Sequence, residues 1–207
     1  DGQASIAIKT AFNNESGSER VLTLTYRVLD RDKKVVAAEE QRVTIKAQQT
    51  LELGQTLVVK KANLWSPEQP HLYTALLSIR EQKKLVDEIA IPFGIRTISY
   101  NAQQGFSLNG QPVKINGGCV HHDNGALGAA ANDRAEYRKA EILKSAGFNA
   151  VRTSHNPPSE AFLDACDELG LMVMDESFDG WRTAKNRFDY ALLFDQWWQQ
   201  DVESMVL

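Results

Sequence analysis

The 207-residue sequence predicts a mixed fold: an immunoglobulin-like β-sandwich over residues 1–98, then the first βα units of a truncated (β/α)8 TIM barrel over residues 99–207. Two observations support this prediction. Apolar and polar residues alternate through the first half, as they do in half-buried strands. After Phe93 the pattern changes to apolar runs separated by helical patterns, which is typical of a parallel sheet covered by helices.

The first half consists of short alternating runs. In residues 21–28, four alternate side chains are apolar and share one face: Leu22, Leu24, Tyr26 and Val28. Similar runs recur over residues 5–12, 35–39, 42–45, 50–59, 72–80 and 85–91. About seven strands at this spacing, without a helical pattern between them, predict an immunoglobulin-like sandwich.

The second half begins with a hairpin signal. Residues 106–108 and 112–115 flank Asn109-Gly110, a dipeptide that tolerates positive φ at both positions and so predicts a tight turn. Parallel strands are expected over residues 114–121, 148–153 and 171–174, and a C-terminal helix over residues 190–207. Because two or three βα units cannot close a barrel, we expect the chain to be a piece of a larger protein.

Two further helices are expected between these strands, each with a capping residue and a terminal glycine. The first begins at Asn132 or Asp133 and ends at Gly147, and the second begins at Ser159 and ends at Gly170. Their apolar faces are expected to comprise Tyr137, Ile142, Leu143 and Ala146 in the first, and Phe162, Leu163, Cys166 and Leu169 in the second.

Composition argues against several classes of partner. The formal net charge is -4 and no dense basic block appears, so the electrostatic footprint of a nucleic-acid-binding protein is missing. No apolar run approaches the roughly 18 residues that a membrane span requires. Neither G-x-G-x-x-G nor G-x-x-x-x-G-K-S/T occurs, which argues against a nucleotide-binding enzyme.

The two cysteines, Cys119 and Cys166, are interpreted as small buried apolar side chains. The cellular compartment stays open, with export among the options.

Polar residues concentrate where each expected parallel strand ends, which is where (β/α)8 barrels place their chemistry. The three segments are His-His-Asp at residues 121–123, Arg-Thr-Ser-His-Asn-Pro-Pro at 152–158 and Asp-Glu-Ser-Phe-Asp-Gly-Trp at 175–181. Carboxylates, a guanidinium and imidazoles can bond several hydroxyls, and an aromatic ring such as Trp181 can cover the apolar face of a sugar. The competing interpretation is structural, because a strand-end Asp or His often only caps a helix or fixes a loop.

At these motifs the sequence resembles glycoside hydrolase family 2, the family of β-galactosidases, β-glucuronidases and β-mannosidases. The matching segments follow the family's order: residues 64–73 and 93–96 of the sandwich, the entry hairpin at 105–114, the strand-two signature at 149–157 and the strand-three ending at 171–176. The resemblance covers nearly the whole chain. It implies the family's sandwich domain over residues 1–98 and the start of its barrel over residues 99–207.

The resemblance implies hydrolysis of terminal β-glycosides with retention, by two glutamates. In the family, the acid/base belongs to an Asn-Glu pair after strand four and the nucleophile follows strand seven. The only such pair here, Asn14-Glu15, lies in an expected turn of the sandwich. Asp175 and Glu176 are poor substitutes, because neighbouring residues on a strand point to opposite faces. We therefore expect no catalytic residue within this chain and no activity of the isolated 207 residues.

The resemblance also implies binding roles for matched positions. Three residues are expected to contact the sugar or orient the nucleophile: His122, Arg152 and His155. Asp175 and Glu176, which match the family's Asp-Glu pair, are expected to support them, and Trp181 is added as a supporting residue because of its aromatic ring. Some members bind magnesium through a Glu-x-His that follows the Asp-Glu pair. Residues 178–182 do not show this pattern, so neither a metal nor another cofactor is expected.

The sequence does not identify the sugar, and we favour β-galactosides from the general similarity of the motifs. The expected partner is a carbohydrate substrate, with nucleic acid and membrane excluded and a homo-oligomer allowed. Two alternatives stay open. One is a stand-alone sandwich module that binds glycan or protein, against which the unfinished parallel sheet argues. The other is a metal-dependent enzyme using His122, His155 and Asp175.

Overall fold

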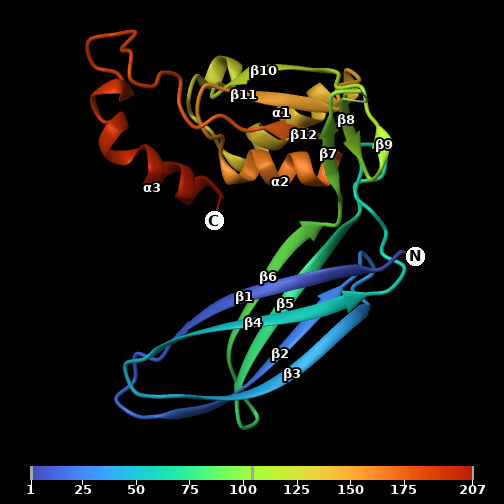
Figure 1. Cartoon of the computed structure of the whole chain (residues 1–207), viewed down its shortest axis with the longest axis vertical. Coiled ribbons are helices and arrows are strands. Elements are labelled where there is room, and N and C mark those ends of the chain that lie inside the picture. The colour runs from blue at the N-terminus through green and yellow to red at the C-terminus, as the bar shows by residue number, and fades with distance from the viewer. Residues whose placement is uncertain (1, 104, 207) are drawn as a thin grey trace. The chain divides into compact units, whose positions relative to one another are not determined.

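The computed structural model describes residues 2–103 and 105–206 (Figure 1). The chain divides into two compact units, Asp1–Thr97 and Ile98–Leu207. The first is built of strands, and the second combines strands with helices. Within the described part of the chain, no helix is long and apolar enough to cross a membrane.

The first unit is an antiparallel sandwich of two sheets. Its strands are β1 (Ala4–Asn13), β2 (Arg20–Leu29), β3 (Val35–Ile45), β4 (Thr50–Val59), β5 (Leu72–Glu81) and β6 (Lys84–Gly94). One sheet pairs β1 with β4, and the other has the order β3-β2-β5-β6. All of these pairings are antiparallel. The sandwich that the alternating runs predict is confirmed.

The sequence pattern is wrong about one break between strands. Residues 35–39 and 42–45 belong to the single strand β3. The intervening Glu40 and Gln41 stay in the ladder, paired with β2. Glu and Gln lack the turn-forming chemistry of Gly, Pro, Asn or Asp, so the backbone hydrogen bonds continue through them. The described residues of the first unit therefore form six strands.

Both sheets contribute alternate side chains to one core. Leu24, Tyr26 and Val28 of β2 are fully buried, and they pack in the same cluster as Phe12 of β1 and Leu57 of β4. Burial of apolar surface stabilises the folded chain by about 25 cal/mol per Å². The apolar residues that alternate along the sequence are therefore the residues that form this core.

Trp65 anchors the irregular segment between β4 and β5. Its side chain is buried, and its backbone N–H donates to the carbonyl of Ile95 at 2.8 Å. The Arg96 guanidinium lies 4.8 Å from the centre of its ring. Gly94 leaves the necessary space, because a Cβ at that position would lie 2.9 Å from the Trp65 Cβ.

The second unit opens with a small antiparallel sheet of order β7-β8-β9. Its strands are β7 (Ile98–Asn101), β8 (Gly105–Leu108) and β9 (Gln111–Pro112). Asn109 and Gly110 connect β8 to β9 with φ angles of 53° and 75°. Both residues thus adopt the left-handed conformation that a type I′ turn requires, and the predicted hairpin is confirmed.

A parallel sheet of order β10-β11-β12 follows, as the apolar runs predict. Its strands are β10 (Gly117–His121), β11 (Ala150–Ser154) and β12 (Met172–Met174), with helices α1 (Asp133–Ser145) and α2 (Glu160–Leu169) between them and α3 (Phe194–Val206) after them. The side chain of Asn132 caps α1 by accepting from the N–H of Ala135, and Ser159 caps α2 by accepting from the N–H of Phe162.

Helices α1 and α2 pack against one face of this sheet. The core between them includes Val151 of β11 and Phe162 of α2. Two residues expected on the buried side of α1, Ile142 and Ala146, are instead exposed. At 3.6 residues per turn both residues lie on a different side of the helix from the buried Ala140. The buried face of α1 therefore differs from the apolar face that the sequence predicts.

The two cysteines have opposite surroundings, whereas both were expected to be buried. Cys166 of α2 is buried, and burial raises the pKa of its thiol to about 12. Cys119 of β10 is exposed. It alternates with Gly118 and Val120, so its side chain lies on the sheet face that α1 and α2 do not cover.

We expect Gly94→Ala to destabilise the sandwich by about 1–3 kcal/mol, because the added methyl group overlaps the buried Trp65 side chain. Gly54→Ala is the matched control, since it also lies in a strand but a Cβ there meets no atom within 4 Å. Denaturant unfolding of both variants measures the difference. Equal midpoints for the two variants would show that the packing of Trp65 adjusts without cost.

Candidate active site at the ends of the parallel strands

Arg152 projects from the open face of the parallel sheet. In β11 it alternates with Val151 and Thr153, whose side chains are buried. Its neighbours in the ladder are Cys119 of β10 and Met174 of β12, and both are exposed. Strand alternation therefore places the guanidinium on the side opposite the helices.

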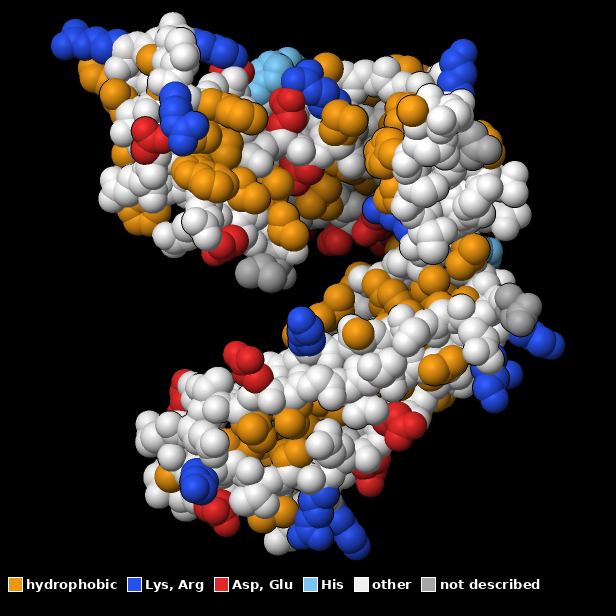
Figure 2. Space-filling view, viewed as in Figure 1, with side chains coloured by type: hydrophobic (Ala, Val, Ile, Leu, Met, Phe, Trp, Pro, Cys, Tyr) orange, Lys and Arg blue, Asp and Glu red, His pale blue; other side chains and the backbone are white. Residues whose placement is uncertain are grey.

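Glu176 joins Arg152 to His155. Its carboxylate oxygen Oε1 forms an ion pair with Nη2 of Arg152. Its second oxygen, Oε2, lies 2.8 Å from Nδ1 of His155. Arg152 lies within β11, His155 follows β11 and Glu176 follows β12, and the three side chains form one connected group, which we call the Arg152 group. In Figure 2 histidine, basic and acidic side chains adjoin on the surface of the second unit.

The Arg152 group holds Glu176 as an anion. Desolvation raises the pKa of this carboxyl, but the hydrogen bonds from His155 and Arg152 outweigh it, and the net pKa lies below the ordinary value. The Arg152 guanidinium also donates from Nη1 to the Sγ of Cys119 at 3.2 Å. Glu176 is thus fixed as a hydrogen-bond acceptor at neutral pH rather than as a proton donor.

Thr153 fixes the turn that follows β12. Its hydroxyl donates to Oδ1 of Asp175 at 2.9 Å and accepts from the backbone N–H of Glu176 at 3.0 Å. Asp175 is therefore bonded on the Thr153 side of β11, while the Glu176 carboxylate reaches the Arg152 side. Sequence reasoning missed Thr153. Its only signal was a hydroxyl at a position that alternates with Val151, on the buried face of β11.

Asp179 and Lys185 extend the site on the other side of His155. Oδ1 of Asp179 lies 4.0 Å from Nε2 of His155 and 2.7 Å from Nζ of Lys185. The hydrogen bond from Lys185 lowers the pKa of Asp179. Neither residue was assigned from the sequence, because their proximity depends on the path of the loop after β12.

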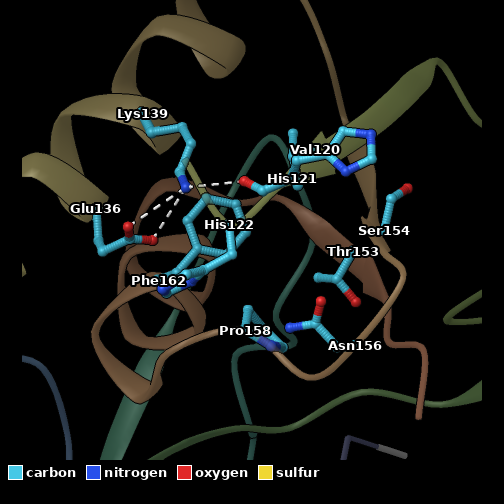
Figure 3. Close-up of a pocket in the computed structure, with 10 residues that line it drawn as sticks. All are labelled: Val120, His121, His122, Glu136, Lys139, Thr153, Ser154, Asn156, Pro158 and Phe162. Carbon is cyan, nitrogen blue, oxygen red and sulfur yellow. Dashed lines mark hydrogen bonds and ion pairs between the residues drawn. The ribbon is translucent and has the colours of Figure 1, made fainter. Parts of the chain in front are cut away.

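His121, rather than His122, lies against the Arg152 group. The ring of His121 packs edge-on to that of His155, with centroids 5.5 Å apart and an interplanar angle of 88°. His122 is exposed and lines a small pocket beside Lys139 and Glu136 (Figure 3). Among the described residues, His122 has no hydrogen bond to the Arg152 group.

Lys139 holds the end of β10 and the start of the loop that follows it, where His121 and His122 lie. Its Nζ donates to the carbonyls of His121 and Asp123, at 3.4 and 3.2 Å, and pairs with the buried carboxylate of Glu136 at 3.2 Å. Figure 3 shows this amine between α1 and the end of β10. This network could not be predicted from the sequence, because a Lys and a Glu three residues apart are ordinary on the surface of a helix.

Trp181 belongs to an aromatic cluster rather than to the Arg152 group. Its ring is 67% exposed and stacks on Phe194 of α3, with centroids 6.1 Å apart. Phe194 also meets Tyr190 and Trp198. Figure 2 shows hydrophobic side chains gathered around α3. Trp181 therefore presents an open aromatic face that a sugar ring could cover.

The residues after Glu176 do not fit a magnesium site. Asp179 already accepts a hydrogen bond from Lys185, and the adjacent positions offer Phe178 and Trp181 in place of further oxygen ligands. Within residues 2–103 and 105–206, no group of three or more His, Cys, Asp and Glu side chains could hold a metal ion.

Family models match both units of the chain. The model for glycosyl hydrolases family 2 matches residues 1–96, and the model for the TIM barrel domain of the same family matches residues 101–191. The chain belongs to glycoside hydrolase family 2. The fold that the resemblance implies, a sandwich followed by the start of a TIM barrel, is confirmed.

Similar proteins cover most of the chain. The β-galactosidase BoGH2A of Bacteroides ovatus is 40% identical over 205 residues, which is 99% of this chain and 24% of that protein. A solved family 2 member from Bacteroides cellulosilyticus is 45% identical, with a TM-score of 0.92 over 99% of this chain and 26% of that one. A solved β-glucuronidase of Bacteroides uniformis is 30% identical, with a TM-score of 0.81 over 85% of this chain and 21% of that one. The chain thus spans about a quarter of the length of such relatives.

We expect the pKa of the Glu176 carboxyl to lie below the ordinary value for Glu, because His155 and Arg152 donate hydrogen bonds to the charged form. Because the folded-state pKa is depressed, the contact stabilises the fold above the ordinary pKa and is lost as the pH falls through the folded-state pKa. Carbon-13 NMR of the side-chain carboxyl measures the midpoint. Arg152→Gln should raise this midpoint, and an unchanged value would show that Arg152 does not stabilise the charged form.

Proposed function

We propose that the protein containing this chain is a retaining exo-glycosidase that hydrolyses terminal β-galactosides. The observation that carries the proposal is the Arg152 group at the carboxyl ends of β10–β12, in a chain 40% identical to a β-galactosidase. Active sites of TIM barrels are built at these strand ends. The ionic and hydrogen-bonding groups there suit a ligand rich in hydroxyls.

The two catalytic carboxylates of the proposed reaction lie outside residues 1–207. A retaining glycosidase needs a proton donor and a nucleophile about 5–5.5 Å apart. A general acid works best with a pKa near the operating pH, whereas the pKa of Glu176 is lowered. Asp175 is bonded to Thr153 on the other side of the strand. Neither carboxylate is therefore arranged for this pair of roles.

Arg152 is proposed to orient the nucleophile. A guanidinium carries five N–H donors in a rigid fork, of which this structure uses two, towards Glu176 and Cys119. The others remain for a carboxylate brought in by the rest of the barrel. His155 is proposed to contact the sugar from beside Glu176, and His122 from the neighbouring loop. Trp181 offers its exposed ring as a further sugar-contacting face.

The charges of the site support a neutral sugar. Lys185 pairs with Asp179, Arg182 pairs with Asp195, and Arg152 pairs with Glu176. A glucuronide carries a carboxylate that would need a further cation, because Lys185 and Arg182 are ion-paired and the remaining donors of Arg152 are assigned to the nucleophile. β-Glucuronides are nevertheless the second candidate substrates, because a β-glucuronidase is among the similar structures.

The substrate assignment is tested on the longer protein with nitrophenyl β-galactoside, β-glucuronide and β-mannoside. We expect kcat/KM for the galactoside to exceed the others by at least ~100-fold, because buried polar groups left unpaired by the wrong sugar are costly. The purified 207-residue chain should hydrolyse none of the three. Turnover by this chain that disappears in Glu176→Gln would place the catalytic carboxylates here and contradict the proposal. Preference for the glucuronide would contradict the galactoside assignment alone.

Arg152→Ala in the longer protein should lower kcat by about 100- to 1,000-fold, the usual cost of removing one preorganised donor. Arg134→Ala is the matched control, because Arg134 is also an ion-paired arginine but lies on the exposed side of α1. Steady-state kinetics with both variants measures the effect. An unchanged kcat in a folded Arg152→Ala enzyme would remove the proposed role of this residue.

A further inference from the structure

The end of β10 carries two adjacent histidines that lie in different surroundings. The ring of His121 packs against His155 of the Arg152 group, whereas His122 lines the small pocket beside α1. In Figure 3 the rings of His121 and His122 lie on different sides of the chain. The path of the backbone at this point therefore decides where both rings lie, because a change in that path would move the two together.

A tight turn separates the two histidines. The backbone N–H of Asp123 donates to the carbonyl of His121 at 2.8 Å, which closes a three-residue γ-turn with His122 at its centre. This hydrogen bond lies beyond the ladder of the parallel sheet, since β10 ends at His121. One local hydrogen bond holds such a turn only weakly, so its conformation depends on what else binds it.

Lys139 of α1 binds both ends of this turn. Its Nζ donates to the carbonyls of His121 and Asp123, at 3.4 and 3.2 Å, which are the first and third residues of the γ-turn. The ammonium also lies 5.1 Å from the centre of the buried Phe162 ring of α2. A lysine ammonium has three N–H donors, so two carbonyls and one carboxylate satisfy it completely.

Glu136 supplies that carboxylate and holds the next residue of the same loop. It is buried, pairs with Nζ of Lys139 at 3.2 Å and accepts from the side-chain N–H of Asn124 at 2.7 Å. Glu136 lies in the first turn of α1, where the partial positive charge of the helix end favours an anion. The helix thus fixes the ion pair, and the ion pair fixes residues 121–124.

We infer that Lys139 is a positioning residue for the reaction: it holds the γ-turn at the end of β10 and so sets the orientation of His121 and His122 at the sugar site. Its own side chain is largely buried on the helix side of the sheet, so its effect passes through the backbone of the turn. The inference rests on the proposed glycosidase function, but it does not depend on which sugar is hydrolysed.

Lys144 provides a matched comparison on the same helix. Its Nζ also donates to a backbone carbonyl, that of Gly170, at 2.8 Å. Gly170 ends α2 and precedes β12, so this contact lies at the opposite end of the parallel sheet from the Arg152 group. The two lysines make the same kind of contact but hold different segments. A loss that occurs with Lys139 and not with Lys144 is therefore a property of the turn.

The kinetic experiment replaces the buried ion pair by neutral side chains in the longer protein. Lys139→Met alone would leave the Glu136 carboxylate buried without its cation, which is strongly destabilising. The double variant Glu136→Gln/Lys139→Met has no unpaired buried charge, and denaturant unfolding reports whether it folds. Glu136→Gln/Lys139→Gln is a milder replacement if it does not.

We expect the folded double variant to lose about 10- to 100-fold in kcat/KM on the nitrophenyl glycoside that the wild type hydrolyses fastest, because displaced contact groups carry costs of this size. The loss should appear in KM, since the two histidines are placed to contact the sugar rather than the reacting atoms. Lys144→Met should leave KM unchanged. A wild-type KM in the folded double variant, or an equal rise in Lys144→Met, would overturn the inference.

Histidine NMR of the same variants tests the positioning without any sugar. Carbon-13 labels at Cε1 report the surroundings of each ring, and single His→Gln variants assign the signals. The signals of His121 and His122 should shift in the double variant but not in Lys144→Met, while His71 of the sandwich stays in place in both. Unshifted signals of His121 and His122 in the folded double variant would contradict the proposed role of Lys139. This comparison needs no turnover, so it separates a failure of the inference from a failure of the proposed function.

Discussion

The alternation of side chains along β11 is the constraint on which the candidate site depends. Val151 and Thr153 are buried, and between them Arg152 must point to the opposite face of the parallel sheet. Val151 packs against the helices, while the Arg152 guanidinium forms an ion pair with Glu176, which follows β12. A shift of one residue in the register would bury the guanidinium and expose the core, so stability and site geometry are determined by the same pairing.

Glu176 links the end of β12 to β11 through both its backbone and its side chain. Its backbone N–H is bonded to Thr153, and its carboxylate is bonded to Arg152 and His155. The turn after β12 is thereby held on both faces of β11. Removing Arg152 would leave the carboxylate with a single polar partner, so the charge of Glu176 and the orientation of His155 are coupled.

The sequence was sufficient for the features that depend on local pattern. Alternation gave the strands of the sandwich, Asn109-Gly110 gave the hairpin, and Ser159 with Gly170 gave the limits of α2. The missed features depend on neighbours that are distant in the chain. The strand break at Glu40 was wrong because pairing with β2 overrides weak local preference.

Site residues show the same division. Arg152, His155 and Glu176 could be named because they follow apolar strands, where barrels place their chemistry. Lys139 could not, because its importance comes from reaching back to the loop of His121 across α1. Nor could the sequence choose between His121 and His122. The end of β10 falls between them, and the path of the chain at that point decides which ring meets His155.

The chain is similar to enzymes named for two different sugars. The chain is 40% identical to a β-galactosidase and 30% identical to a β-glucuronidase of solved structure, and both alignments span most of it. The contact between Arg152 and Glu176 forms within this chain, before any sugar binds. Arg182 and Lys185 are paired with carboxylates, and the proposed role of Arg152 directs its remaining donors to the nucleophile. We therefore propose that the group that distinguishes one sugar from another enters from outside these strand ends, and that β10–β12 supply the part of the site common to both classes of enzyme.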